Sequence, residues 1–440
     1  MACRVLPEEP SEAAAGSLDA LVPLFYESLP RRDQRNWARV YLNGLLSTTG
    51  KKTIRNIAGA DAGSVEQSLQ QFISKSPWDW TPVRRSLARY LEGTVPAPLA
   101  WVVRPLVIEK AGDRSVGVGR QFVPQLGRTA NCQQANGIWL ASGEAGFPVE
   151  WSLTLPVPWT SERLRRRAGI PDTARALSPA QDAVLAVLRM ASGWELRRRP
   201  VVMEVGRTEF LPCAAAFALR GIPFVLKVDG DLPVAGCGSG RARGGPPAAP
   251  AREVAAALRG RRRTVEWTRP GGAGGAVTRL AATAVTAAPA ADRGSGPAVP
   301  VPAPLLLLGA WAGDEPQPGE FWITNVADRT PAQLFLLAKL ADRVDLDCAE
   351  VCERVGIRDF EGRSFRGWHH HATLASVAHA AAVLGGGRRA APDLPPAPPH
   401  HRIPAAVAAV RAERPVGRDQ PARYVLDDCP GSRNGPDMGE

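Results

Sequence analysis

Residues 200–228 read PVVMEVGRTEFLPCAAAFALRGIPFVLKV, and this stretch decides the fold. Two short apolar runs, residues 201–205 and 223–228, have the length and composition of buried strands. Residues 209–220, which lie between them, predict a helix. A strand, a helix and a second strand in succession predict an α/β sheet covered by helices.

Upstream of this stretch the sequence predicts two further kinds of structure. Residues 18–95 carry apolar side chains at a spacing of three to four, which is typical of a bundle of about four helices. Residues 100–159 consist of short, alternating, β-branched segments and predict an antiparallel meander. Residues 178–194 predict another helix, which leads into the strand at residue 201.

Downstream, residues 305–326 predict two more strands. A long helix then begins at Pro331, and Thr330 caps it. A final helix spans about residues 368–384. The long helix carries one apolar stripe at helical spacing, so we expect it to pack against other elements. The stripe consists of Leu334, Leu337, Ala341, Val344, Cys348, Val351 and Val355.

The remaining segments have a different composition. Residues 229–303 are rich in Gly, Ala, Pro and Arg, which predicts a long and partly disordered insertion in which only residues 263–267 form a strand. We expect the ends of the chain, residues 1–17 and 385–440, to be disordered. The seven cysteines are scattered, which favours reduced thiols over a disulfide framework.

The charge of the chain favours a polyanionic partner. Lys and Arg number 54 against 43 Asp and Glu, which gives a formal net charge of +11. Such a field attracts nucleic acid and makes binding dependent on salt. A GC-rich genome also enriches Arg, Ala, Gly and Pro, so charge alone is a weak argument. The sequence has no apolar run long enough to cross a bilayer and no signal-peptide core, and we expect a cytoplasmic protein.

Three segments together resemble the DDE transposases of bacterial insertion sequences, the DDE superfamily endonuclease domain. Residues 101–133 read WVVRPLVIEKAGDRSVGVGRQFVPQLGRTANCQ, and the segment 200–228 supplies a strand, a carboxylate, a glycine and a helix. Residues 321–345 read FWITNVADRTPAQLFLLAKLADRVD, and residues 359–380 read DFEGRSFRGWHHHATLASVAHA. Single fragments are unspecific, but their order and spacing are distinctive.

The resemblance implies an α/β fold, a ribonuclease-H-like mixed sheet with flanking helices, preceded by an all-helical domain and interrupted by an insertion. The implied parts are a disordered N-terminus (1–17), a helical DNA-binding domain (18–95), the first part of the core (96–228), the insertion (229–303), the second part of the core (304–384) and a disordered tail (385–440).

The family's chemistry requires acids at fixed places. Phosphodiester cleavage and strand transfer use two divalent cations, Mg²⁺ or Mn²⁺, which are held by carboxylates from separate elements. Residue by residue, the first acids of the family fall at Arg104 and Pro105, and neither side chain ligates a cation. The other two fall at Glu204 and Asp345, which are the catalytic and metal-binding remnants that the resemblance implies. Glu109, just beyond the same strand, is a candidate substitute for the missing acid.

Basic residues near the resembling motifs are candidate contacts to DNA. They are Arg31, Arg32, Arg35, Lys51, Lys52, Lys110, Arg120, Arg363 and Arg366. The family binds double-stranded DNA at terminal inverted repeats, and the sequence leaves open whether this chain dimerises. The consecutive histidines 369–371 point in three directions on a helix, so they cannot all ligate one ion, and we expect packing or phosphate contact instead.

Three hypotheses follow. The preferred one is a transposase-like DNA-binding protein whose catalysis is impaired and which binds no metal tightly, because Arg104 and Pro105 replace the first acid. The second is an active metal-dependent transposase that uses Glu204, Asp345 and the displaced Glu109. The third is a protein-interaction module that kept the fold and lost nucleic-acid binding.

Overall fold

A computed structural model of the chain describes residues 12–59, 62–236, 248–272, 274–287, 301 and 305–386. The N-terminal part is helical, as the sequence predicted. It contains α1 (Glu12–Leu21), the 3-10 turn η1 (Val22–Phe25), α2 (Arg32–Ser47), α3 (Ile54–Ala58), α4 (Ala62–Ser74) and α5 (Trp80–Thr94). The predicted disordered segment 1–17 overlaps α1 from Glu12 on, and residues 1–11 and 387–440 lie outside the described residues.

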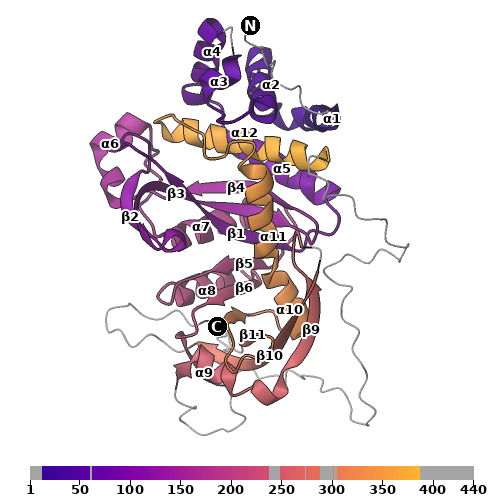
Figure 1. Cartoon of the computed structure of the whole chain (residues 1–440). Coiled ribbons are helices and arrows are strands. Elements are labelled where there is room, and N and C mark those ends of the chain that lie inside the picture. Colours follow the sequence, from indigo (N-terminus) through magenta and orange to yellow (C-terminus); the bar gives the residue numbers. More distant parts are fainter. Residues whose placement is uncertain are drawn as a thin grey trace, which may run out of the picture. The chain divides into compact units, whose positions relative to one another are not determined.

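The described strands form one mixed sheet of twelve strands (Figure 1). They are β1 (Ala100–Glu109), β2 (Gly119–Val123), β3 (Arg128–Ala141), β4 (Gly146–Leu153), β5 (Val201–Glu204), β6 (Phe224–Val228), β7 (Pro233–Gly236), β8 (Ala249–Pro250), β9 (Arg263–Thr268), β10 (Gly275–Ala287), β11 (Leu305–Ala312) and β12 (Glu320–Thr324). The main path runs β2-β3-β1-β5-β6-β12-β11-β10-β7-β8, with β4 paired to β3 and β9 paired to β10.

Strand direction divides this sheet into zones. β3 pairs antiparallel with β1, β2 and β4, which confirms the predicted antiparallel strands but not a simple meander, because β1 lies beside β3 and not beside β2. β1, β5 and β6 run parallel to one another, and β12 returns antiparallel beside β6. This mixed α/β arrangement confirms the ribonuclease-H-like fold class that the resemblance implied. It also places the end of β5 beside the middle of β1, near Arg104, at the centre of the sheet.

Helices cover both faces of the sheet. Side chains of consecutive strand residues point to opposite faces. Arg104 on β1 bonds to α11 (Leu340–Asp347), whereas its neighbour Pro105 is paired with Asn136, whose amide bonds to the start of α7 (Pro179–Gly193). α11 and α7 therefore lie on opposite faces. The shorter helices α6 (Glu162–Ala168), α8 (Phe210–Leu219), α9 (Ala251–Ala256) and α10 (Pro331–Ala338), with the turns η3 (Pro124–Leu126), η4 (Val157–Thr160) and η5 (Arg259–Arg261), complete the core.

The last helix, α12 (Phe365–Leu384), lies between the N-terminal helices and the sheet. It contacts α1, α2, α4 and α5 on one side and β4 on the other. Of the residues from Phe365 to Ala382, all but Arg366 are buried, so the helix has no face in water. Ser364 caps its first turn through Gly367, and the helix therefore begins three residues earlier than the sequence predicted.

Two sequence predictions need correction. Within 229–303 we expected only residues 263–267 to form a strand, and this was wrong, because β7, β8, α9 and β10 are also ordered there. β10 reads GAVTRLAATAVTA, and its Ala and Thr side chains give only a weak apolar alternation; pairing with β9, β7 and β11 fixes it as a strand. Residues 237–247, 273, 288–300 and 302–304 lie outside the described residues.

The long helix predicted from Pro331 is also interrupted. It is divided at Lys339 into α10 and α11, and a π-helical turn, η6 (Cys348–Cys352), follows directly. Its cap at Thr330 forms as predicted, with Gln333 completing a capping box. Most of the predicted apolar stripe is buried, from Leu334 to Val355. The pattern therefore predicted which face is packed, but not that the helix is divided into separate segments.

Candidate functional site

The candidate site lies where β1, β5 and α11 meet. Arg104 extends from β1, Glu204 is the last residue of β5, and Asp345 is on α11. Two parallel strands and a helix across them bring together three residues that lie far apart in the sequence. The site is therefore assembled by the sheet topology, at the place where the resemblance put the family's acids.

Arg104 holds Asp345 with a two-pronged hydrogen bond. Its Nε donates to Oδ1 at 2.7 Å, and its Nη2 donates to Oδ2 at 2.5 Å. The remaining Nη1 lies 3.9 Å from Oε2 of Glu204. This fork is the geometry in which guanidinium binds carboxylate most strongly. One permanently charged side chain thus faces both remnant acids.

α11 is fixed so that Asp345 faces β1. Two residues further on, the buried Asp347 accepts a hydrogen bond from the Gly146 backbone N–H at 2.6 Å and is paired with Arg343. Residues two apart on a helix point in different directions, so the anchor at β4 turns Asp345 toward Arg104. Gly146 is needed for this approach, because a Cβ there would lie 2.9 Å from Val344.

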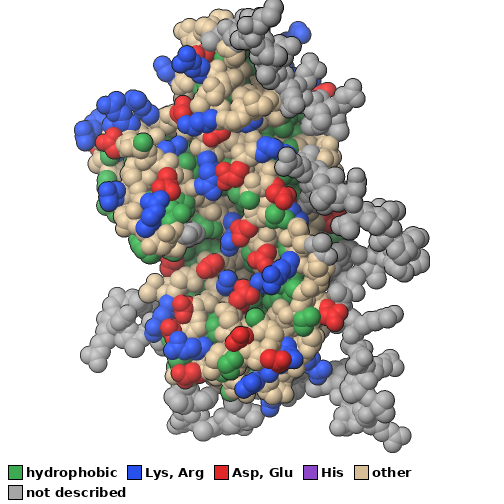
Figure 2. All heavy atoms as spheres, in the orientation of Figure 1, with side chains coloured by type: hydrophobic (Ala, Val, Ile, Leu, Met, Phe, Trp, Pro, Cys, Tyr) green, Lys and Arg blue, Asp and Glu red, His purple; other side chains and the backbone are tan. Residues whose placement is uncertain are grey.

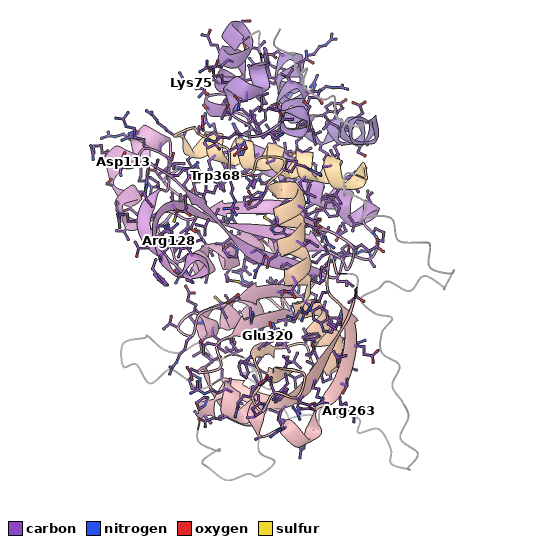
Figure 3. The ribbon with its side chains drawn as sticks, in the orientation of Figure 1. Lys75, Asp113, Arg128, Arg263, Glu320 and Trp368 are labelled. Carbon is purple, nitrogen blue, oxygen red and sulfur yellow. The ribbon has the colours of Figure 1, made fainter. Side chains whose placement is uncertain are left out.

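A second ionic cluster adjoins the first. Nζ of Lys339 donates to both carboxylate oxygens of Glu320 at 2.9 and 3.1 Å and lies 3.4 Å from Asp342. Nζ of Lys227, on β6, lies 3.5 Å from Glu320 as well. Lys339 is also within 6 Å of the ring centres of Trp267, Trp322 and Phe335. Figure 3 labels Glu320, at the start of β12.

Both clusters line one cavity of about 160 Å³. Its charged lining consists of Glu204, Glu320, Asp342 and Asp345 with Arg104, Lys227 and Lys339. Each carboxylate lies within 4 Å of a cationic group, so each of these acids already has a cationic side chain as a partner. Among the described residues, no group of three or more His, Cys, Asp or Glu could hold a metal ion. The donor set does not fit the pair of divalent cations that the family uses.

The structure does not bring Glu109 to this site. It is five residues beyond Arg104 on β1, which is about 16 Å along a strand and on the opposite face of the sheet. Its carboxylate is paired instead with Arg128 on β3 at 2.7 Å. Pro105 also faces away from Asp345, toward the side that α7 covers.

Several of the predicted DNA contacts are committed within the protein. Arg35 donates to the Leu29 and Pro30 carbonyls, Arg31 lies 3.6 Å from Asp33, and Lys51 is paired with Glu361. The ammonium of Lys110 donates to the Phe360 carbonyl at 2.8 Å, and burial lowers the pKa of Lys110. The side chains of Arg32, Arg120, Arg363 and Arg366 make no hydrogen bond or ion pair with any residue that the structure describes. Lys52 is buried and is treated further below.

The three consecutive histidines are packing residues. His369 stacks on Trp80, and His370 stacks on Trp78 with ring centres 3.7 Å apart. His371 joins Nδ1 to the Tyr41 hydroxyl and Nε2 to the Gly356 carbonyl. Burial lowers the pKa of His370 and of His371 to about 4 and lowers the pKa of His369 well below its usual value. They are therefore uncharged near neutral pH and cannot attract phosphate.

Sequence reasoning missed the second cluster. Lys339 and Asp342 lie within a segment that resembles the family, and Glu320 directly precedes it. No spacing rule, however, joins the start of a strand to a helix junction about twenty residues later. Lys339 carried the one available signal, since it is a cation within an otherwise apolar helical run. Its role depends on the aromatic rings of β9 and β12, which only the folded chain brings together.

Comparison with known proteins gives one match. The model of a family described as DDE superfamily endonuclease matches residues 24–273, which is more than half of the chain. The matched residues include Arg104 and Glu204, while Asp345 lies beyond them. No curated protein matches the chain. Among the described residues, none of the helices is long and apolar enough to span a bilayer.

Proposed function

This chain belongs to the DDE superfamily endonucleases, and we propose that it binds double-stranded DNA without cleaving it. Membership makes it a transposase-like or nuclease-like protein. The proposal adds that duplex binding remains while the metal-dependent chemistry is lost. One observation carries it: the Arg104 guanidinium occupies the space between Asp345 and Glu204, where the family's cations would have to be held.

The electrostatics oppose metal binding in this arrangement. Arginine stays protonated at any physiological pH, so Arg104 cannot leave the acids by losing its charge. Two unit charges 4 Å apart near a protein surface interact by roughly 4 kcal/mol, and a divalent ion doubles the repulsion. A metal ion would also have to displace two direct hydrogen bonds from Asp345. Glu204 and Asp345 supply only two of the three carboxylates that the family needs.

Support for duplex binding comes from family membership and from charge. The chain has a formal net charge of +11, and several exposed arginines make no ion pair with any described residue. Lys and Arg that neutralise backbone phosphates provide most of the affinity in non-specific DNA binding. This affinity does not depend on the acids between β1 and α11, so it survives their neutralisation.

The decisive experiment measures binding and cleavage on the same duplex. We expect the full chain to shift a labelled duplex at low salt and to leave supercoiled plasmid intact with Mg²⁺ or Mn²⁺. Mn²⁺-dependent nicking that disappears in Glu204→Ala or Asp345→Ala would refute the loss of cleavage. Nicking that disappears in Glu109→Ala would establish an active enzyme with a displaced acid. Absence of binding to any duplex at low salt would favour a protein-interaction module.

A substitution at Arg104 tests the electrostatic reasoning directly. Arg104→Asp removes the guanidinium and supplies a third carboxylate, so we expect it to bind Mn²⁺ in calorimetry where the natural chain does not. Arg114→Asp makes the same change of charge at an exposed residue away from the site and is the matched control. Equal Mn²⁺ binding by the natural chain and by Arg104→Asp would refute the idea that Arg104 excludes the ion.

A further inference from the structure

A groove beside the start of α12 has the features of an anion site. It encloses about 510 Å³ and is lined by the segment from Lys52 to Arg55, the end of α4, Arg167 at the end of α6, and the loop 359–364. We call it the basic groove; its five cationic side chains are Lys52, Arg55, Lys75, Arg167 and Arg363. Figure 2 shows Lys and Arg side chains gathered over α6, and Figure 3 labels Lys75 beside α4.

Four of the five cations are exposed and uncommitted. The side chains of Arg55, Lys75, Arg167 and Arg363 make no hydrogen bond or ion pair with any residue that the structure describes. Many other cations of this fold do have acidic partners, as Arg39 has Asp19 and Arg85 has Glu27. A group of four exposed cations without partners, drawn from four separate segments, is therefore not explained by stabilisation of the fold.

The three acids of the groove neutralise only part of the charge of its five cations. The acids are Glu66, Asp359 and Glu361. Glu361 is paired with Lys51, outside the set of five, and Asp359 accepts the backbone N–H of Lys52 at 2.8 Å. The groove therefore retains a positive excess after its internal contacts are formed.

Lys52 is the second and independent sign of a ligand. The residue is only 5% exposed, and it lines the groove. Its ammonium has no direct hydrogen bond or ion pair with any described residue. Burial lowers the pKa of Lys52, and the neighbouring Asp359 carboxylate opposes this shift without contacting the ammonium. Burying an ammonium without a direct hydrogen-bond acceptor is costly. The fold nevertheless makes room for its side chain: Gly356 has φ 79°, and a Cβ there would lie 2.4 Å from Cγ of Lys52.

The start of α12 adds to the positive field. Ser364, the cap of this twenty-residue helix, lines the groove together with Gly362 and Arg363. The N-terminal end of a helix carries partial positive charge and unpaired backbone N–H groups, which favour phosphate. The side chain of Ser364 accepts a hydrogen bond from the N–H of Gly367 and caps the first turn. The groove lies beside this N-terminal end of α12.

We propose that the basic groove binds the phosphate backbone of duplex DNA, with Lys52 on one phosphate and the four exposed cations along the neighbouring ones. This inference rests on the proposed DNA binding and names its location. A free nucleotide fits less well, because the two aromatic residues of the lining, Tyr41 and Phe360, are both buried and leave no exposed ring for a base. Backbone contacts of this kind position the duplex and carry no sequence information.

The salt dependence of binding tests this assignment. We expect a triple variant, Lys75→Ala, Arg167→Ala and Arg363→Ala, to lower the slope of log K against log salt by roughly 2.7, from about 0.9 for each lost phosphate contact. The matched control changes three exposed arginines of another region, Arg261→Ala, Arg263→Ala and Arg269→Ala. It should lower the slope of log K against log salt less than the groove variant does. Figure 3 labels Arg263 on β9, well away from Lys75 in that view.

The outcomes separate this inference from the proposed function. If the groove variant binds the duplex with the same affinity and salt slope as the natural chain, the assignment of duplex binding to the basic groove is wrong, while the proposed DNA binding stands. If the natural chain binds no duplex at low salt, the proposed function fails first. Binding of inorganic phosphate without affinity for a duplex, or tighter binding of duplex RNA, would overturn the assignment to DNA.

Lys52→Met provides a second readout that a structural role would not produce. Methionine keeps a long side chain and removes the buried charge, so we expect the melting temperature to rise and the salt slope to fall by about 0.9. A purely structural lysine would give a lower melting temperature and unchanged affinity. That result would remove Lys52 from the site.

Discussion

Acid should destabilise this protein through the buried histidines of α12. His370 and His371 have pKa values of about 4 in the folded chain, against the ordinary value of 6.5, because burial disfavours their charged forms. The unfolded chain takes up these protons first. Stability is therefore complete above pH 6.5 and is lost as the pH falls toward 4.

The size of the effect follows from these values. One pKa unit corresponds to about 1.4 kcal/mol, so each of the two histidines removes about 2 kcal/mol between pH 7.5 and 5 and about 3 kcal/mol by pH 4. Asp182 acts in the opposite direction, because burial raises its pKa to about 6 and the folded chain takes up its proton first. It returns about 1.4 kcal/mol at pH 5, which leaves a net loss of about 2.5 kcal/mol from these three groups.

The assay is urea unfolding at pH 7.5 and 5.0, at constant ionic strength, for the natural chain and for His371→Gln. The glutamine amide can accept from the Tyr41 hydroxyl and donate to the Gly356 carbonyl, as the neutral imidazole does, but it does not titrate. We expect the loss between the two pH values to be about 2 kcal/mol smaller in the variant. An equal loss in both proteins would show that His371 is not the group that titrates.

Three further substitutions, two at or beside α12 and one on α7, are tested by urea unfolding. Arg84→Lys should lower the free energy of unfolding by about 3 kcal/mol, because the fully buried guanidinium bonds at once to Glu150, Thr373 and His369, and an ammonium cannot span all three. A decrease of less than about 1 kcal/mol would contradict this. Asp182→Asn should raise stability by roughly 2 kcal/mol at pH 7.5 and lose that advantage near pH 4, since the raised pKa reflects a penalty on the ionised form. Ser364→Ala should cost about 1 kcal/mol through loss of the helix cap, whereas Ser364→Gly should cost only a few tenths, and equal losses would argue against capping.

The central part of the fold could be predicted because its local patterns agree with its tertiary environment. Residues 201–205 and 223–228 are short apolar runs, and they form the buried parallel strands β5 and β6. β10 could not be found in this way, since its Ala and Thr side chains give little contrast between its two faces. What makes β10 a strand is its pairing with neighbours that are distant in the sequence.

The candidate site was partly predictable for a different reason. The resemblance located Arg104, Glu204 and Asp345, and the folded chain brings these three together. Sequence alone could not say which cations have partners. Lys51 and Lys52 are adjacent and looked equivalent, yet one forms an exposed ion pair and the other is buried with no direct contact to its ammonium from any described residue. Such differences depend on residues 356–361, about three hundred positions away.

The position of α12 bears on how the chain is made. This helix is the last described element, yet the N-terminal helices pack directly against it. While the ribosome is still adding residues before 365, α1, α2, α4 and α5 lack the packing that α12 supplies, although α2 contacts α4 and α5 contacts β4 without it. The buried surface of the N-terminal part is therefore completed only when residues 365–384 have been synthesised, and until then it is exposed to chaperones or proteases. A chain truncated before residue 365 would therefore keep all the described strands but lose the helix against which its N-terminal helices pack.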